Sequence, residues 1–209
     1  LIFERTAWSA DRVMSSTIAT LPEFLTLFPS EAPALGLDLD VGSLAILFSD
    51  LAGSTELFAR LGDSQAYALV QDHYRLVAQI VAQHDGAVVK TMGDAQMASF
   101  SRPDDALLAA LEMCHKTHQA HGLELKAAFH FGPCLAVRAN HHLDFFGATV
   151  NLAARLKTSA RPGQVAFSAE LLRHPAIAEQ LRANNLAPKI VELQIKGFHH
   201  KQRAALLDT

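Results

Sequence analysis

The chain is poor in cysteine: its 209 residues include only Cys114 and Cys134. Two cysteines cannot build the disulfide framework that stabilises small secreted domains, so we expect a reducing, cytoplasmic environment. Basic residues are not in excess either, because 18 lysines and arginines face 21 aspartates and glutamates, for a net charge of −3. Such a chain has no positive field to hold nucleic acid, and we expect no nucleic-acid partner.

Long apolar runs are also missing. No run approaches the roughly 20 residues that a helix needs to cross a bilayer, and the N-terminus does not look like a signal peptide. Half of the residues are nevertheless hydrophobic, which is enough for a sizeable core in one domain with an extension. The chain starts at Leu1 rather than Met, so we expect a fragment of a longer protein with an upstream regulatory domain.

One segment, D-F-F-G-A-T-V-N-L-A-A-R, combines an acid, an amide and a guanidinium. Asn151 and Arg155 are four residues apart and therefore share one helix face, and Asp144 stands just before this helix. A rigid guanidinium fork suits a phosphate, and an amide suits a sugar oxygen. Because such pairs more often face solvent than form a site, the pair needs support from other segments.

A second segment, F-S-D-L-A-G-S-T, follows a buried strand. The apolar run Leu44–Phe48 indicates this strand, Asp50 ends it, and Gly53, Ser54 and Thr55 open an amphipathic helix that the Ser or Thr can cap. Backbone N–H groups at a helix start bind phosphate oxygens, and a nearby carboxylate would hold a bridging Mg²⁺. The alternative is an ordinary strand-to-helix turn with a capping Asp.

A third segment places Gly93 and Asp94 between two short apolar runs. This pattern indicates a tight β-hairpin with an acid at its tip. Asp is common in turns for local reasons, so the hairpin alone specifies no site. Two acids at two strand ends, Asp50 and Asp94, could however hold a pair of metal ions. Two-metal sites activate the attacking oxygen and stabilise the leaving oxygen in phosphoryl chemistry.

Together these segments resemble the catalytic domain of the class III nucleotidyl cyclases, of the bacterial adenylate cyclase type. The signatures F-S-D-L-A-G-S-T, K-T-M-G-D, F-H-F-G-P and D-F-F-G-A-T-V-N-L-A-A-R occur in the family's order and at its spacing. The similarity runs from about Val41 to the C-terminus. It implies residues 1–40 as a helical extension or linker and residues 41–209 as the catalytic domain.

The resemblance also implies roles for individual residues. Asp50 and Asp94 match the two aspartates that bind a pair of Mg²⁺ or Mn²⁺ ions in each active site. The backbone carbonyl of Leu51 matches a further ligand. Lys90 and Asp144 match the pair that reads the adenine ring. The phosphates would meet the helix start at Gly53, Ser54 and Thr55.

The remaining matches concern the reacting groups. Asn151 and Arg155 match the pair that holds the ribose and stabilises the transition state, and Lys196 matches the lysine that binds the terminal phosphates. In this reaction the ribose 3′-oxygen attacks the α-phosphate in line and pyrophosphate departs. Positioning and electrostatics provide most of the catalysis, so no Ser or Cys nucleophile is needed. The resemblance implies a head-to-tail homodimer in which one subunit supplies the metal aspartates. The other subunit supplies Lys90, Asp144, Asn151, Arg155 and Lys196.

The choice of base follows from hydrogen bonding. Lys90 can only donate, which suits adenine N1, and Asp144 can accept from the exocyclic amine. Guanine presents a carbonyl and an N–H at these places, and the guanylate-type relatives carry Glu and Cys there. We therefore expect ATP as the substrate. The alternatives are a guanylate or promiscuous cyclase and a nucleotide-binding regulatory module without turnover.

The coarse pattern of elements predicts an α/β (α+β) fold. Helical spacing covers residues 69–81 and is closed by Gly86, and a second helix opens at Ser101 and Pro103. Leu125–Phe131 is predicted as a strand and Pro133–Val137 as its partner. The resulting order β-α-β-β-α-β is the ferredoxin-like arrangement, which the cyclase family elaborates. The tail adds a helix near Glu179–Arg182 and strands near Ile190–Ile195 and Ala204–Leu207.

Some segments remain outside the motifs. Ala10–Phe28 has helix-compatible spacing, and Ser30–Gly36 separates it from the catalytic strand. This helix either transmits a signal from an upstream domain or only packs on the core.

The histidines do not have the spacing of a zinc site. His130 is expected to be a packed core residue. Lys126 on the same strand could reach the interface, but a solvated lysine is the main expectation. The pair His141 and His142 is predicted in a short loop before Asp144, where the family has a dimerisation arm.

Overall fold

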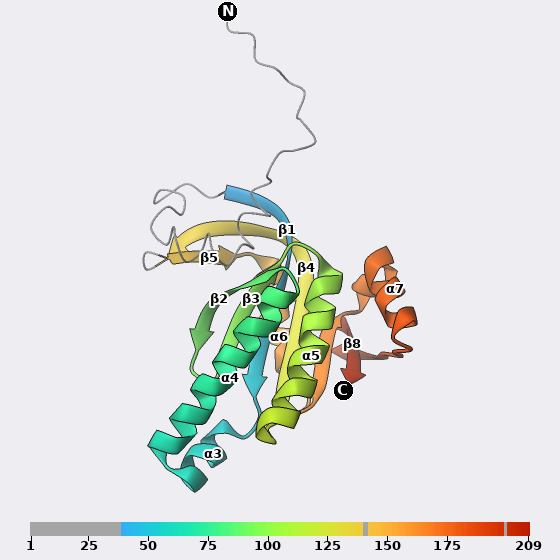
Figure 1. Cartoon of the computed structure of the whole chain (residues 1–209). Coiled ribbons are helices and arrows are strands. Elements are labelled where there is room, and N and C mark those ends of the chain that lie inside the picture. Colours follow the sequence, from blue (N-terminus) through green and yellow to red (C-terminus); the bar gives the residue numbers. More distant parts are fainter. Residues whose placement is uncertain (1–38, 140–141, 199) are drawn as a thin grey trace, which may run out of the picture.

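The computed structural model in Figure 1 describes residues 39–139, 142–198 and 200–209. The helix predicted over Ala10–Phe28 and the linker predicted over Ser30–Gly36 lie outside these residues. None of the helices in the described part is long and apolar enough to cross a bilayer.

The described residues form one mixed sheet flanked by helices. The strands are β1 (Leu39–Leu51), β2 (Gly86–Met92), β3 (Ala95–Phe100), β4 (Leu125–Ala139), β5 (His142–Phe146), β6 (Gln164–Ser168), β7 (Lys189–Leu193) and β8 (Gln202–Asp208). Their order is β2-β3-β1-β4-β6-β8-β7, and β5 pairs with the outer part of β4. All neighbours are antiparallel except β4 and β6. The predicted β-α-β-β-α-β order is confirmed.

Helices cover both faces of this sheet. They are α3 (Ser54–Leu61), α4 (Asp63–Gln83), α5 (Pro103–His121), α6 (Ala148–Lys157), the 3₁₀ helix η1 (Ala169–Arg173) and α7 (Pro175–Ala183). In Figure 1, α4 and α5 lie in front of the strands and α6 lies behind them. The largest buried cluster joins α4, α5 and α7 to one face of the sheet, while two smaller clusters join α6 to the other face.

Strand β1 separates these two layers. Leu44, Ile46 and Phe48 belong to a cluster on the α6 side, whereas Ala45 and Leu47 belong to the cluster on the α4 and α5 side. Side chains alternate between faces along a strand, so every residue of β1 has its face fixed by this register. The even-numbered residues from Leu44 to Asp50 face α6.

Strand β4 corrects one prediction. The segments Leu125–Phe131 and Pro133–Val137 are not paired strands but parts of a single 15-residue strand, and β5 is the partner of its outer half. Pro133 pairs with β1, and on the other edge of β4 it falls between the residues bonded to β6 and those bonded to β5. Because proline has no N–H to donate, this gap in the ladder accommodates it. His142, predicted in a loop, begins β5.

A second correction concerns Gly86, which does not close a helix. Helix α4 ends at Gln83, Asp85 takes a left-handed conformation with φ 53°, and Gly86 is the first residue of β2. A Cβ added at Gly86 would lie 2.4 Å from the ring of Phe100. The glycine is therefore needed for close packing against the neighbouring strand.

A buried histidine lies between α4 and α5. The side chain of His73 has no exposed surface, its Nδ1 lies 3.4 Å from the hydroxyl of Thr117, and its Nε2 has no hydrogen-bond partner among the described residues. Burial lowers the pKa of His73 to about 4, and repulsion from His121 adds to this effect. The folded protein therefore keeps this ring neutral at pH values where an unfolded chain would protonate it.

This difference predicts a pH dependence of stability. Below the ordinary pKa of 6.5, His73 binds a proton in the unfolded chain but stays neutral in the folded chain. The free energy of unfolding should therefore fall as the pH decreases from 6.5 to 4. The loss should reach up to about 3 kcal/mol. Urea unfolding at several pH values measures it. His73→Gln should flatten this dependence, while His118→Gln, at an exposed position of α5, should leave it as in the wild type. Equal slopes for both variants would contradict the assignment.

Candidate active site

Asp50 lies near the end of β1 on the face that α6 covers. Its carboxylate is bound by two lysines: Lys157 Nζ donates to Oδ1 at 2.8 Å, and Lys126 Nζ lies 3.0 Å from Oδ2. Partial burial alone would raise the pKa of Asp50, but the hydrogen bonds from the two lysines outweigh it and hold the pKa below its ordinary value. The three side chains form a partly buried cluster with two positive charges and one negative charge.

Neither lysine was predicted in the site. The prediction of a solvated Lys126 is wrong, because β1 and β4 are in a register that sets Lys126 directly opposite Asp50. Facing residues of an antiparallel pair lie within side-chain reach, so the register decides this contact. Lys157 is the last residue of α6, two positions after Arg155. Its contact with Asp50 depends on where α6 lies on the sheet, which no local pattern specifies.

The β2–β3 turn carries the second acid. Gly93 and Asp94 form the two-residue connection between the paired residues Met92 and Ala95, which confirms the predicted hairpin. Gly93 has φ 66°, a conformation that glycine adopts without strain. Because Ala95 pairs with Asp50 across β1 and β3, Asp94 in the turn lies one residue before the position opposite Asp50.

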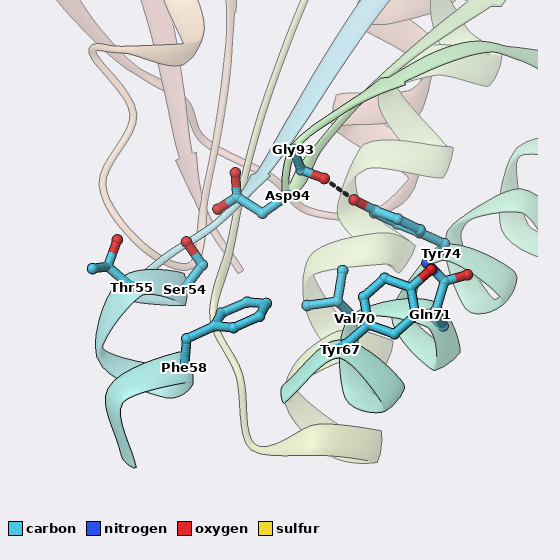
Figure 2. A pocket seen from close by; sticks show the side chains of 9 residues that line it. All are labelled: Ser54, Thr55, Phe58, Tyr67, Val70, Gln71, Tyr74, Gly93 and Asp94. Carbon is cyan, nitrogen blue, oxygen red and sulfur yellow. Dashed lines mark hydrogen bonds between the residues drawn. The ribbon is translucent and has the colours of Figure 1, made fainter. Parts of the chain in front are cut away.

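A pocket of about 450 Å³ lies between this turn and the helices α3 and α4. Figure 2 shows Tyr74 of α4 donating its hydroxyl to the carbonyl of Gly93, with the Asp94 carboxylate directed away from the Tyr74 ring. The lining of the pocket combines apolar side chains with polar groups at the start of α3. The residues that line it are Ser54, Thr55, Phe58, Tyr67, Val70, Gln71, Tyr74, Gly93 and Asp94.

The start of α3 differs from its prediction. Gly53 with φ 72° is the N-cap, and neither Ser54 nor Thr55 caps the helix with its side chain. The first N–H groups of a helix have no intrahelical partner, so they remain available to an anion together with these hydroxyls. The side of the pocket near α3 therefore suits phosphate oxygens.

The two residues predicted to read the base contact each other. Lys90 Nζ donates to Asp144 Oδ2 at 2.5 Å, and the backbone N–H of Phe145 donates to Asp144 Oδ1 at 2.8 Å. The register of β2 shifts between Val88 and Lys90, a bulge of the kind that redirects a side chain. Asp144 is 8% exposed. A donor and an acceptor are thus held side by side between β2 and β5.

Asn151 and Arg155 lie on the outer face of α6. Both are exposed, while Leu152 and Leu156 of the same helix are buried against the sheet. Within the described residues the side chains of Asn151 and Arg155 make no hydrogen bond or ion pair. The predicted pairing of these residues on one helix face is therefore present, and the groups that they would bind are not supplied by the described part of the same chain.

The F-H-F-G-P motif in β4 packs against the start of α6. The hydroxyl of Thr149 donates to the carbonyl of Pro133 at 2.7 Å, and a Cβ added at Gly132 would approach the same hydroxyl to 2.8 Å. The start of α6 thus packs directly on the backbone of β4. His130 in this motif is 8% exposed, as predicted for a packed histidine, and lies 3.7 Å from Glu170.

The last of the predicted residues is Lys196. It is exposed in the turn between β7 and β8 and makes no ion pair within the described residues. Its neighbour Ile195 is buried in the same cluster as Leu152 and Leu156 of α6. The turn is therefore packed near the helix that carries Asn151 and Arg155.

The donor set fits a hard divalent cation. Asp50 and Asp94 offer carboxylate oxygens, and the hydrocarbon side chain of Leu51 has no ligating atom, so that residue can offer only its carbonyl. No group of three or more ligating side chains occurs in the described residues. Mg²⁺ is commonly bound by one or two carboxylates, with waters and substrate phosphates as the other ligands. The two ammonium groups at Asp50 already occupy positions that attract positive charge.

Comparison with known proteins identifies relatives. Residues 39–202 match the family model described as the adenylate and guanylate cyclase catalytic domain. Adenylate cyclase 2 of Rhizobium meliloti is 31% identical over 174 residues, which cover 74% of this chain and 47% of that protein. Guanylate cyclase 2G of Mus musculus is 31% identical over 144 residues, or 60% of this chain and 13% of that protein. The chain thus spans less than half the length of these curated relatives.

Solved structures show the same fold. The adenylyl cyclase CyaB from P. aeruginosa aligns with a TM-score of 0.67 at 22% identity, covering 83% of this chain and 96% of that one. The catalytic core of a rhodopsin-guanylyl cyclase with converted specificity, in complex with ATPalphaS, aligns with a TM-score of 0.69 at 20% identity. That alignment covers 82% of this chain and 98% of the other.

The bond from Tyr74 to Gly93 leads to a prediction about the turn. Tyr74→Phe removes only the hydroxyl, so the turn should open more easily, by about 1 kcal/mol. Amide hydrogen exchange at Ala95 should become about fivefold faster, since local opening governs exchange. Tyr67→Phe is the matched control, because that side chain is 60% exposed and makes no hydrogen bond within the described residues. Unchanged exchange in Tyr74→Phe would show that the bond does not hold the turn.

Proposed function

Because this chain belongs to the family of adenylate and guanylate cyclase catalytic domains, we propose that it converts ATP into 3′,5′-cyclic AMP and pyrophosphate. The observation that carries the choice of ATP is the contact between Lys90 and Asp144. An ammonium group can only donate and an ionised carboxylate can only accept. Adenine offers the complementary pair, an acceptor at N1 and a donor at the exocyclic amine.

The phosphates of ATP would lie at the start of α3. There the N–H groups after Gly53 and the hydroxyls of Ser54 and Thr55 face the pocket that Asp94 also lines. Two Mg²⁺ or Mn²⁺ ions, bound by Asp50, Asp94 and the carbonyl of Leu51, would lower the pKa of the attacking 3′-hydroxyl and neutralise the departing pyrophosphate.

The exposed residues of α6 would complete the reaction. Asn151 would orient the ribose, and the guanidinium of Arg155 would stabilise the charge that develops on the α-phosphate. Lys196 would bind the terminal phosphates. All three side chains are exposed and none has an ion-pair partner within the described residues, which suits groups that meet a ligand.

These exposed groups support a site shared between two copies of the chain. In a head-to-tail dimer, one copy would supply Asp50 and Asp94, and its partner would supply Lys90, Asp144 and the α6 residues. An exposed apolar pair supports the same proposal: Leu135 and Phe146 face each other across β4 and β5 and are 39% and 54% exposed. Exposed apolar surface of this kind marks protein interfaces.

The direct test is turnover by the purified chain. Incubation with Mn²⁺ and either ATP or GTP should yield cyclic AMP in large excess over cyclic GMP, and Asp50→Ala should yield neither. Cyclic GMP as the main product would make the protein a guanylate cyclase. No product from a protein that still binds ATP would make it a nucleotide-binding module.

The base assignment predicts a change of specificity. Lys90→Glu combined with Asp144→Cys should lower kcat/KM for ATP and raise the ratio of GTP to ATP turnover. Each lost buried hydrogen bond should contribute about 1–3 kcal/mol to this discrimination. Lys189→Glu, which reverses an exposed charge on β7 at the opposite edge of the sheet from β2, should keep the wild-type ratio. An unchanged ratio in the double variant would show that these side chains do not contact the base.

The shared site predicts complementation between inactive variants. Asp50→Ala and Arg155→Ala should each be inactive alone, but a mixture should regain roughly a quarter of wild-type activity, since half the dimers are heterodimers with one intact site of two. A mixture of Asp50→Ala with Asp94→Ala should stay inactive, because both lesions affect the same half of each site. Subunit exchange is verified with two differently tagged chains. If exchanged Asp50→Ala and Arg155→Ala mixtures remain inactive, the site is built within one chain.

A further inference from the structure

Each oxygen of the Asp50 carboxylate is already bound by a lysine. Lys157 binds Oδ1 at 2.8 Å and Lys126 lies 3.0 Å from Oδ2. The side chains of Asp50, Lys126 and Lys157 are 21%, 25% and 18% exposed, so solvent screens these contacts only in part. This is more than a surface ion pair, because both oxygens of one acid are engaged by separate ammonium groups.

A divalent cation at Asp50 would compete with these lysines. A metal ion that coordinates either oxygen is repelled by both ammonium groups, and this repulsion is relieved only if at least one of them moves away. Metal binding in this state therefore includes the work of displacing at least one lysine. The released ammonium group then needs another anion, since a partly buried charge without a partner is unfavourable.

Lys157 is better placed to leave than Lys126. Lys126 lies within β4, directly opposite Asp50 in the ladder, with β1 paired on one side. Lys157 is the final residue of α6, and the helix places it two residues after the exposed Arg155. Its long side chain starts at a helix end, where a change of rotamer disturbs no strand pairing. Polyphosphate is the anion that the proposed substrate brings.

We propose that Lys157 takes the place of a metal ion at Asp50 and moves to the phosphates when nucleotide binds, which opens the carboxylate to the divalent cation. This inference rests on the proposed binding of metal and nucleotide, but not on turnover. Metal and nucleotide then favour each other through one side chain. Such coupling is reciprocal and commonly amounts to between fivefold and a hundredfold in affinity.

Removing the charge of Lys157 should change the affinities for metal and for nucleotide in opposite directions. Lys157→Met keeps an unbranched side chain of similar length and removes the charge. Without nucleotide, Mn²⁺ should bind this variant on the order of tenfold more tightly, because no ammonium group has to leave Oδ1. Without metal, ATP should bind it more weakly, because the phosphates lose a cation. A variant that only damaged the fold would weaken both.

The experiment measures the two affinities separately on the full chain. Electron paramagnetic resonance of free Mn²⁺ gives metal binding in the absence of nucleotide, and equilibrium dialysis of ATP in the presence of EDTA gives metal-free nucleotide binding. Lys157→Arg keeps the charge, so it should show neither the tighter Mn²⁺ binding nor the weaker ATP binding of Lys157→Met. Lys189→Met removes the same charge from an exposed position on β7 and should change neither affinity.

The outcomes separate this inference from the proposed function. Tighter Mn²⁺ and weaker ATP binding by Lys157→Met support it even if no cyclic nucleotide is formed, in which case only the proposed turnover fails. Unchanged or weaker Mn²⁺ binding by that variant overturns the inference. Wild-type Mn²⁺ affinity in Asp50→Asn overturns it too, because the metal would then not bind at this carboxylate.

Discussion

The alternation of side chains along β1 is the constraint on which the rest of the structure depends. This strand is paired on both edges, to β3 and β4, and covered on both faces, with Leu44 to Phe48 at most 5% exposed. A slip of one residue would exchange its two faces and move Asp50 from the α6 layer to the α4 and α5 layer. The core therefore sets the register, and the register sets which side chains Asp50 can meet.

Most of the polar side chains of the candidate site fall into two groups. Asp50 with its two lysines, and Lys90 with Asp144, are partly buried and compensated within the chain. Asn151, Arg155 and Lys196 are exposed and make no ion pair within the described residues. Burial explains the division, because an unpaired charge can persist in water but not in the interior. The compensated groups hold their geometry before a ligand arrives, while the exposed ones are available to it.

Much of this arrangement could be predicted from the sequence. The apolar run Leu44–Phe48 predicts a strand from its own composition, and it lies inside β1. The Gly93-Asp94 dipeptide predicts a tight turn in the same local way, and it connects β2 to β3. The order of elements up to the start of β4 was also predictable, because these helices and strands have their own periodicity, whereas β5 and β6 were not predicted.

Contacts that depend on two segments at once were not predictable in this way. The pairing of Lys126 with Asp50 depends on the register of β1 against β4, and that of Lys157 depends on how α6 lies on the sheet. Pro133 was predicted as the first residue of a separate strand, Pro133–Val137. The structure accommodates it where β4 has a bonded neighbour on one edge only. Gly86 was predicted to end a helix, a role that uses the backbone freedom of glycine. In the structure its role is to leave room for the Phe100 ring.

Strand β4 links three parts of the site in a fixed frame. Lys126 near its start faces Asp50, Gly132 and Pro133 in its middle seat α6, and Val137 beyond them pairs with Asp144. Inserting or deleting one residue between these positions would turn everything on one side of the change to the opposite face of the sheet. The length of β4 between Lys126 and Val137 can therefore change during evolution only by two residues at a time or with a compensating bulge.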